Sequence, residues 1–143
     1  MKINFIFEKK IQLSRDAKKR LKDVIIYISG NENTLFGIIN IIFCSDEFIK
    51  KYNREYLDHD FETDIITFHD SDAEGNVEGE LLISADTVSF NSKRFKTDIE
   101  EEFSRVIIHG ILHLCGYKDK TKAEKIKMKK KENFYLNSLK SLN

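Results

Sequence analysis

Clustered apolar positions along the chain predict four short β-strands. Residues 3–7 and 35–43 are rich in β-branched and aromatic side chains, and both runs are too short for a typical helix. Residues 65–68 form a third apolar run, which is followed by an acidic, glycine-containing stretch at 69–78 and by an apolar segment at 80–83. This succession of segments is typical of a β-hairpin.

Helical spacing and start signals predict helices between these strands. Ser14 is a suitable N-terminal cap for a helix that runs to about residue 28 and has four apolar residues on one buried face: Ala17, Leu21, Val24 and Ile25. Ser45 caps a second helix at about 46–57, and residues 86–94 have the pattern of a third.

Two capping boxes predict the longer helices of the C-terminal half. Thr97 with Glu100 opens a helix that runs to about Cys115, and Gly116 ends it. Thr121 with Glu124 opens a final helix with a patchy apolar face made of Ala123, Ile126, Phe134, Leu136 and Leu139. The elements together predict an α+β fold, a single domain over residues 1–143 with about five helices packed on a mixed four-stranded sheet.

The composition is that of an ordinary globular protein, with 41% hydrophobic and 34% charged residues. The N-terminal apolar run is short and broken by charges, so it does not resemble a signal peptide, and no stretch approaches the roughly 20 apolar residues of a membrane span. Cys44 and Cys115 are therefore expected to be reduced thiols. We expect a cytoplasmic protein with no membrane partner.

Charge is unevenly distributed although the formal net charge is zero. The segment 58–80 contains nine acidic residues and no Lys or Arg, whereas the segment 118–131 contains eight lysines and two acids. The lysines are either a solvated helix surface or a patch that attracts a polyanion such as RNA.

His109 and His113 are the residues with the clearest chemistry. Their spacing of four places both imidazoles on one face of a helix, where they can chelate one metal ion. Asp119 follows just beyond the Gly116 stop, so the returning chain can supply a third ligand. We expect zinc by preference, with manganese, iron or nickel as alternatives; the other interpretation is two stacked histidines without a metal.

The string around these histidines, H-G-I-L-H-L-C-G-Y-K-D at 109–119, resembles the signature H-G-x-L-H-L-x-G-Y-D-H of the YbeY family of metal-dependent ribosomal RNA endonucleases. Residues 53–68 are similar to the family's N-x-x-Y-R…T-D-V-L-S-F segment, and residues 79–84 to its G-D-I-x-I-S strand. The resemblance implies a small cytoplasmic α+β protein that binds zinc through three histidines. It also implies cleavage of single-stranded RNA in small-subunit ribosomal RNA 3′-end maturation and ribosome quality control.

The chain departs from this family pattern at two functional positions. Asp119 stands where the third histidine is expected, and a carboxylate there shifts preference toward harder metals. Leu57 stands where the family has a functional arginine. Arg54, one helical turn earlier, is the candidate replacement as a catalytic phosphate contact, with Lys118 and Lys120 as rivals.

Glu102 is a second candidate for a catalytic role. It lies seven residues before His109, two helical turns back on the same face, where it could accept a proton from the imidazole or hold water, unless it is simply a surface carboxylate.

The sequence leaves three functions open. The main hypothesis is a single-strand-specific metallo-endoribonuclease with ribosomal RNA as partner and no DNA substrate. The alternative is a non-catalytic, metal-stabilised ribosome-assembly factor that docks on RNA or on a small-subunit ribosomal protein. A metallopeptidase is disfavoured because Gly110 occupies the position of the general base in H-E-x-x-H enzymes.

Overall fold

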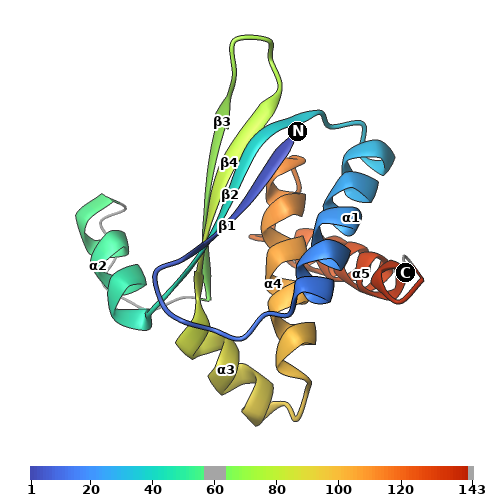
Figure 1. Cartoon of the computed structure of the whole chain (residues 1–143). Helices are drawn as coiled ribbons and strands as arrows, with labels where there is room; N and C mark the ends of the chain where they lie inside the picture. The colour runs from blue at the N-terminus through green and yellow to red at the C-terminus, as the bar shows by residue number, and fades with distance from the viewer. Residues whose placement is uncertain (57–63, 142–143) are drawn as a thin grey trace.

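The computed structural model describes residues 1–56 and 64–141 (Figure 1). Over these residues the chain forms four strands and five helices. The expected α+β class, with a mixed four-stranded sheet and five helices, is confirmed. Within the same residues, no helix combines the length and apolar character needed to cross a membrane. Cys44 and Cys115 are free thiols.

The four strands lie in the order β1-β2-β4-β3. β1 pairs with β2 and β2 with β4 in parallel, whereas β3 and β4 pair antiparallel. The strands are β1 (Lys2–Phe7), β2 (Phe36–Cys44), β3 (Ile65–Ser71) and β4 (Val77–Ser84). The predicted hairpin is therefore present at one edge of the sheet, and its turn is tighter than expected. Pairing continues to Ser71 and Val77, and the carboxylate of Asp72 accepts hydrogen bonds from the backbone N–H groups of Glu74 and Asn76, both at 2.9 Å.

The five helices begin and end close to the expected residues. They are α1 (Arg15–Asn31), α2 (Asp46–Tyr56), α3 (Ala85–Arg94), α4 (Ile99–Leu114) and α5 (Lys122–Leu139). Ser14 caps α1 by accepting a hydrogen bond from the N–H of Ala17, and Thr121 with Glu124 forms the expected capping box of α5.

The capping box predicted at the start of α4 is wrong. Asp98 is the N-cap residue and makes no side-chain capping hydrogen bond. Thr97 lies one residue before the cap, and its hydroxyl donates instead to the carboxylate of Glu102 at 3.0 Å. Glu100 contributes its charge to the first turn of the helix, where it interacts favourably with the helix dipole.

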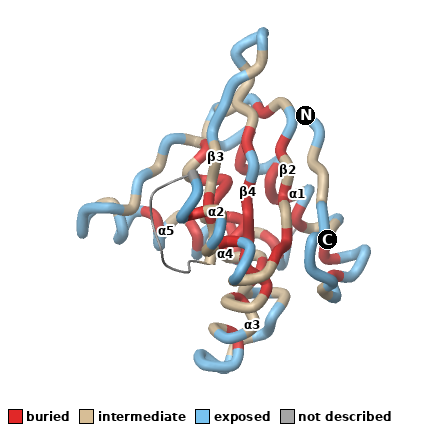
Figure 2. The backbone as a smooth tube through the Cα atoms, turned by 90° about the vertical axis from the view of Figure 1, so that its left-hand side faces the viewer, coloured by how far each residue is buried: buried red, intermediate tan, exposed pale blue. Residues whose placement is uncertain are grey.

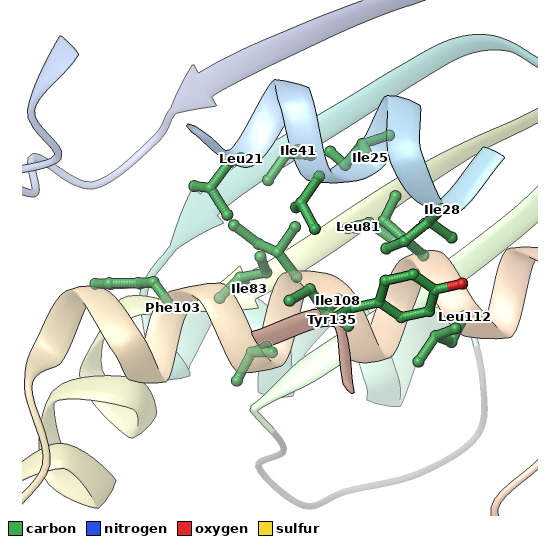
Figure 3. Close-up of a cluster of buried hydrophobic side chains, with 14 of the residues drawn as sticks. Leu21, Ile25, Ile28, Ile41, Leu81, Ile83, Phe103, Ile108, Leu112 and Tyr135 are labelled. Atoms are coloured by element: carbon green, nitrogen blue, oxygen red, sulfur yellow. The ribbon is translucent and has the colours of Figure 1, made fainter. Parts of the chain in front are cut away.

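Helices cover the two faces of the sheet unequally (Figure 1). The larger core lies between the sheet and the helices α1, α4 and α5, and Figure 2 shows the buried residues gathered along these elements. Figure 3 shows apolar side chains from both layers interlocking, among them Leu21, Ile25, Ile41, Leu81 and Ile108. A smaller cluster beneath α2, made of Cys44, Ile49, Ile66 and Leu82, covers part of the opposite face.

The predicted apolar face of α5 is partly wrong. Ala123 is exposed, and Ile126 and Phe134 are 51% and 50% exposed, whereas Met128 and Tyr135 are buried with Leu136 and Leu139. α5 packs crosswise on α4 and α1, as Figure 1 shows, so that its core contacts begin at Met128 and its first turn lies outside the core. The few apolar residues of α5 were not enough to predict which of its faces contacts α4 and α1.

Candidate metal centre

Helix α4 holds its buried face against the sheet and leaves a half-buried stripe beside it. Arg105, His109 and His113 follow one another at intervals of four residues and form this stripe. The side chains of His109 and His113 are 23% and 26% exposed. Both imidazoles are thus fixed by packing but can still reach a ligand from solvent.

Gly110 lies about 100° around the axis of α4 from His109, where the helix approaches the sheet closely. A Cβ atom at this position would lie 2.8 Å from the Cδ1 atom of Ile65 and 2.8 Å from the Cδ2 atom of Leu81. Position 110 therefore faces the sheet, whereas His109 lies on the half-buried stripe. The glutamate of a peptidase of the H-E-x-x-H type has no counterpart here.

Gly116 returns the chain toward the histidines. Its φ angle of +102° is in the left-handed region, which favours glycine. The N–H groups of Gly116 and Tyr117 donate to the carbonyl oxygens of His113 and Leu112, at 3.0 and 3.1 Å, which is a Schellman motif. The loop that follows brings Asp119 back over the stripe.

The three predicted ligands converge on one point. The Nε2 atoms of His109 and His113 are 3.0 Å apart, and an Asp119 carboxylate oxygen lies 3.1 Å from the first and 3.4 Å from the second. A tetrahedral ion with bonds of about 2.0–2.2 Å spaces its ligands about 3.3–3.6 Å apart. His109, His113 and Asp119 could therefore hold one metal ion.

The other ring nitrogens show that the converging atoms are all acceptors. The Nδ1 atom of His113 faces the carbonyl oxygen of Tyr117 at 2.8 Å, and the Nδ1 atom of His109 faces a Glu132 carboxylate oxygen at 2.6 Å. Each Nδ1 must donate, so each neutral ring presents a lone pair at Nε2. Two lone pairs and a carboxylate repel one another unless a cation lies among them, and a divalent ion fits this donor set.

The same electrostatics acts on the proton affinity of His109. Burial alone would lower the pKa of His109, but the hydrogen bond and charge of Glu132, together with the charges of Asp119 and Asp64, raise it above its ordinary value. A positive charge, whether a proton or a metal ion, is therefore favoured at this point.

A half-buried carboxylate, with a side chain 10% exposed, anchors the loop that carries Asp119. Glu32, which follows α1, accepts hydrogen bonds from the hydroxyl groups of Tyr117, at 2.6 Å, and Tyr135, and Lys131 lies 3.2 Å away. Burial alone would raise the pKa of Glu32, but these donors hold it below its ordinary value. Tyr117 thus links the metal centre to α1, with its backbone on His113 and its side chain on Glu32.

The structure does not place the two candidate catalytic residues in this group. Arg54 is an exposed residue of α2, on the other face of the sheet (Figure 1), and Leu57 lies outside the described residues. Glu102 meets Thr97 at the start of α4, two helical turns from His109. Besides Asp119, the carboxylate that contacts His109 is that of Glu132, at Nδ1.

Glu132 is the residue that sequence reasoning missed. A signal existed, because Glu132 lies four residues after Met128 and four before Leu136, on the buried side of α5. A charged residue within an apolar stripe is rarely buried unless it is paired. The lysines around Glu132 made this part of α5 look like an exposed, charged surface.

Comparisons with known proteins agree with the resemblance of the histidine segment. The family model described as Endoribonuclease YbeY matches residues 4–140. Among curated proteins, the chain is 48% identical over 124 residues to Endoribonuclease YbeY of Parabacteroides distasonis, covering 86% of each chain. It is 40% identical over 129 residues to the same-named protein of Cytophaga hutchinsonii, covering 90% of each.

The fold is similar to a solved structure as well. The solution structure of a protein from Thermotoga maritima superposes with a TM-score of 0.68 at 28% identity, over 96% of this chain and 88% of that one. The family match over nearly the whole length, the identities of 40% and 48% and the shared fold lead to one conclusion. This chain belongs to the Endoribonuclease YbeY family.

Proposed function

We propose that residues 1–143 form one metal-dependent hydrolase domain that cleaves single-stranded RNA. The observation that carries this proposal is the convergence of His109, His113 and Asp119, with ligand atoms 3.0–3.4 Å apart, at the beginning of a lysine-rich segment. We further propose zinc as the ion and the 3′ end of small-subunit ribosomal RNA as the substrate. The setting is ribosome maturation and quality control in the cytoplasm.

The chain's own residues position the reaction. A divalent ion, when bound, lowers the pKa of water from about 15.7 toward 7 and polarises a phosphodiester oxygen. His109 and His113 are rigidly held by α4, and Asp119 by a loop anchored through Tyr117, so a group brought to this point meets a fixed geometry. The loop leaves the Asp119 side chain 39% exposed, which keeps an approach open for a long polymer.

Exposed lysines next to the metal centre provide contacts for the RNA backbone. Lys118 and Lys120 flank Asp119, and Lys122 and Lys125 continue the patch along the first turns of α5. Such contacts recognise phosphates and not bases, so affinity should fall as salt rises, with a slope of about −0.7 per phosphate contacted on a single strand. We therefore expect little sequence preference from this surface.

Arg54 remains our proposed replacement for the family arginine, whose position is occupied by Leu57 in this chain. We expect Arg54→Ala to slow RNA cleavage without changing metal content, because the residue is outside the three-ligand group. The Glu102 carboxylate, by contrast, accepts the hydrogen bond of Thr97, and we propose no role for it in the reaction.

Metal content and RNA cleavage measured on the same samples test the proposal. The wild-type chain should contain about one divalent ion by mass spectrometry and cut a single-stranded RNA faster than a duplex of the same sequence. His113→Ala and Asp119→Ala should lose both the ion and the activity, and Glu101→Ala, which changes an exposed acid of α4, should lose neither. A metal-free wild type purified without chelators would contradict the metal site. Bound metal without cleavage would favour the non-catalytic assembly factor.

A further inference from the structure

Glu132 connects the metal centre to the last helix. One carboxylate oxygen lies 2.6 Å from Nδ1 of His109, and the other lies 3.2 Å from a guanidinium nitrogen of Arg105. The second guanidinium nitrogen of Arg105 donates to the side-chain oxygen of Asn133 at 3.1 Å. Arg105 and His109 are one turn apart on α4, so the carboxylate bridges two consecutive members of the histidine stripe.

Burial makes this arrangement specific. Glu132 is only 8% exposed, and a buried carboxylate is strongly destabilising unless charged or hydrogen-bonding partners satisfy it. Arg105 occupies one oxygen and thereby fixes the plane of the carboxylate, which directs the other oxygen at His109. The imidazole cannot rotate about its χ2 angle without losing this hydrogen bond.

We propose that Glu132 is a positioning residue for the metal centre and that Arg105 acts through it. Glu132 keeps the proton of neutral His109 on Nδ1, so that Nε2 points its lone pair at the site shared with His113 and Asp119. Its negative charge also makes the imidazole a stronger donor to a cation. This inference rests on the metal site of the proposed function. It states that a residue of α5, Glu132, helps to set the affinity of that site for its metal ion.

The competing explanation is that Glu132 only ties α5 to α4. A purely structural tie would lower the stability of the metal-free protein and leave the metal affinity of the folded protein unchanged. A positioning role lowers metal affinity even where folding is intact. The two roles therefore differ in a quantity that does not depend on RNA cleavage.

Zinc titration of the metal-free full chain, in competition with a chromophoric chelator, measures that quantity. Glu132→Ala should weaken zinc binding about 10–100-fold, the usual effect of removing a carboxylate behind a ligand histidine. Glu132→Gln should weaken it less, because an amide oxygen can still accept from Nδ1 of His109 while its NH2 group faces Arg105. Glu101→Ala is the matched control and should bind zinc like the wild type.

A double-mutant cycle tests the route through Arg105. Arg105→Ala alone should weaken zinc binding, and in the Glu132→Ala background it should have no further effect. An additive second loss would show that Arg105 does not act through Glu132.

Circular dichroism and urea unfolding of the metal-free variants separate folding from affinity. Folded Glu132→Ala with wild-type zinc affinity would overturn the inference; if that variant does not fold, wild-type affinity in Glu132→Gln and Arg105→Ala would do so. His113→Ala distinguishes failure of the underlying metal site, since zinc binding unchanged in that variant would contradict the site and not the role of Glu132.

Discussion

Replacing Gly110 by alanine should destabilise the protein, although alanine is the better helix former. Gly110 is in the interior of α4, where exchange for alanine favours the helix by about 1 kcal/mol. The new methyl group would however lie 2.8 Å from side-chain atoms of both Ile65 and Leu81, a separation that real Cβ atoms essentially never show. Leu81 is fully buried, so it has little room to move away.

The size of the effect follows from these two opposing contributions. Overpacking a well-filled core costs about 1–3 kcal/mol. After the gain in helix propensity, Gly110→Ala should lower the free energy of unfolding by about 0–2 kcal/mol. Gly30→Ala in α1 is the matched control, because a Cβ there has no neighbour within 4 Å, and it should raise the same free energy by about 0.4–1 kcal/mol.

Urea unfolding of both variants, without metal, measures the comparison. The two free energies should differ by about 1–3 kcal/mol, because helix propensity largely cancels and the packing contribution remains. In thermal unfolding, each kcal/mol corresponds to roughly 2–4 °C for a chain of this size. If Gly110→Ala were stabilised as much as Gly30→Ala, the close approach of α4 to the sheet would not limit this position, and the argument would be refuted.

Three further predictions concern the loop and helix next to the proposed metal centre. Thr121→Ala removes the capping box of α5 and should cost about 0.5–2 kcal/mol in urea unfolding, whereas an unchanged midpoint would show that the cap contributes nothing. Glu32→Gln should destabilise the protein at pH 7 by about 1.5–3 kcal/mol, since a charged acceptor of three donors is lost. The pKa of Glu32 is lower in the folded than in the unfolded protein, so the Glu32 carboxylate stabilises the fold above the unfolded-state pKa, and this stabilisation is lost as pH falls through the folded-state pKa. The difference in unfolding free energy between Glu32→Gln and wild type should therefore shrink on acidification. A constant difference would refute this assignment. Asp119→His supplies a third nitrogen ligand and should shift metal preference from manganese toward zinc in a competition titration. An unchanged preference would show that residue 119 does not contact the ion.

Local patterns predicted most of the fold because each depends on neighbours in sequence. The Ser14 cap, the hairpin of β3 and β4 and the Gly116 stop all rest on residues a few positions apart. The convergence of His109 and His113 has the same local origin, since a helix alone sets their spacing. Asp119 could be predicted as the third member of the group because only a short loop separates it from the helix.

Long-range contacts set the features that the sequence did not reveal. The second carboxylate of the centre is 23 residues from His109, and its place depends on how α5 crosses α4. The same crossing buries Met128 and Tyr135 while it exposes Ile126 and Phe134. Nothing within α5 specifies that angle, because its apolar residues are few.

Electrostatic balance connects the proposed ligand Asp119 to the lysine-rich segment. A divalent ion held by two neutral imidazoles and the Asp119 carboxylate keeps a formal charge of about +1, whereas three imidazoles would leave about +2. Glu132 and Asp64 add further negative charge nearby. The centre alone would therefore attract an RNA phosphate less than a three-histidine site does. Lys118 and Lys120, directly beside Asp119, would supply positive charge, so we expect RNA binding to depend on these side chains and on ionic strength more than it would at a three-histidine site.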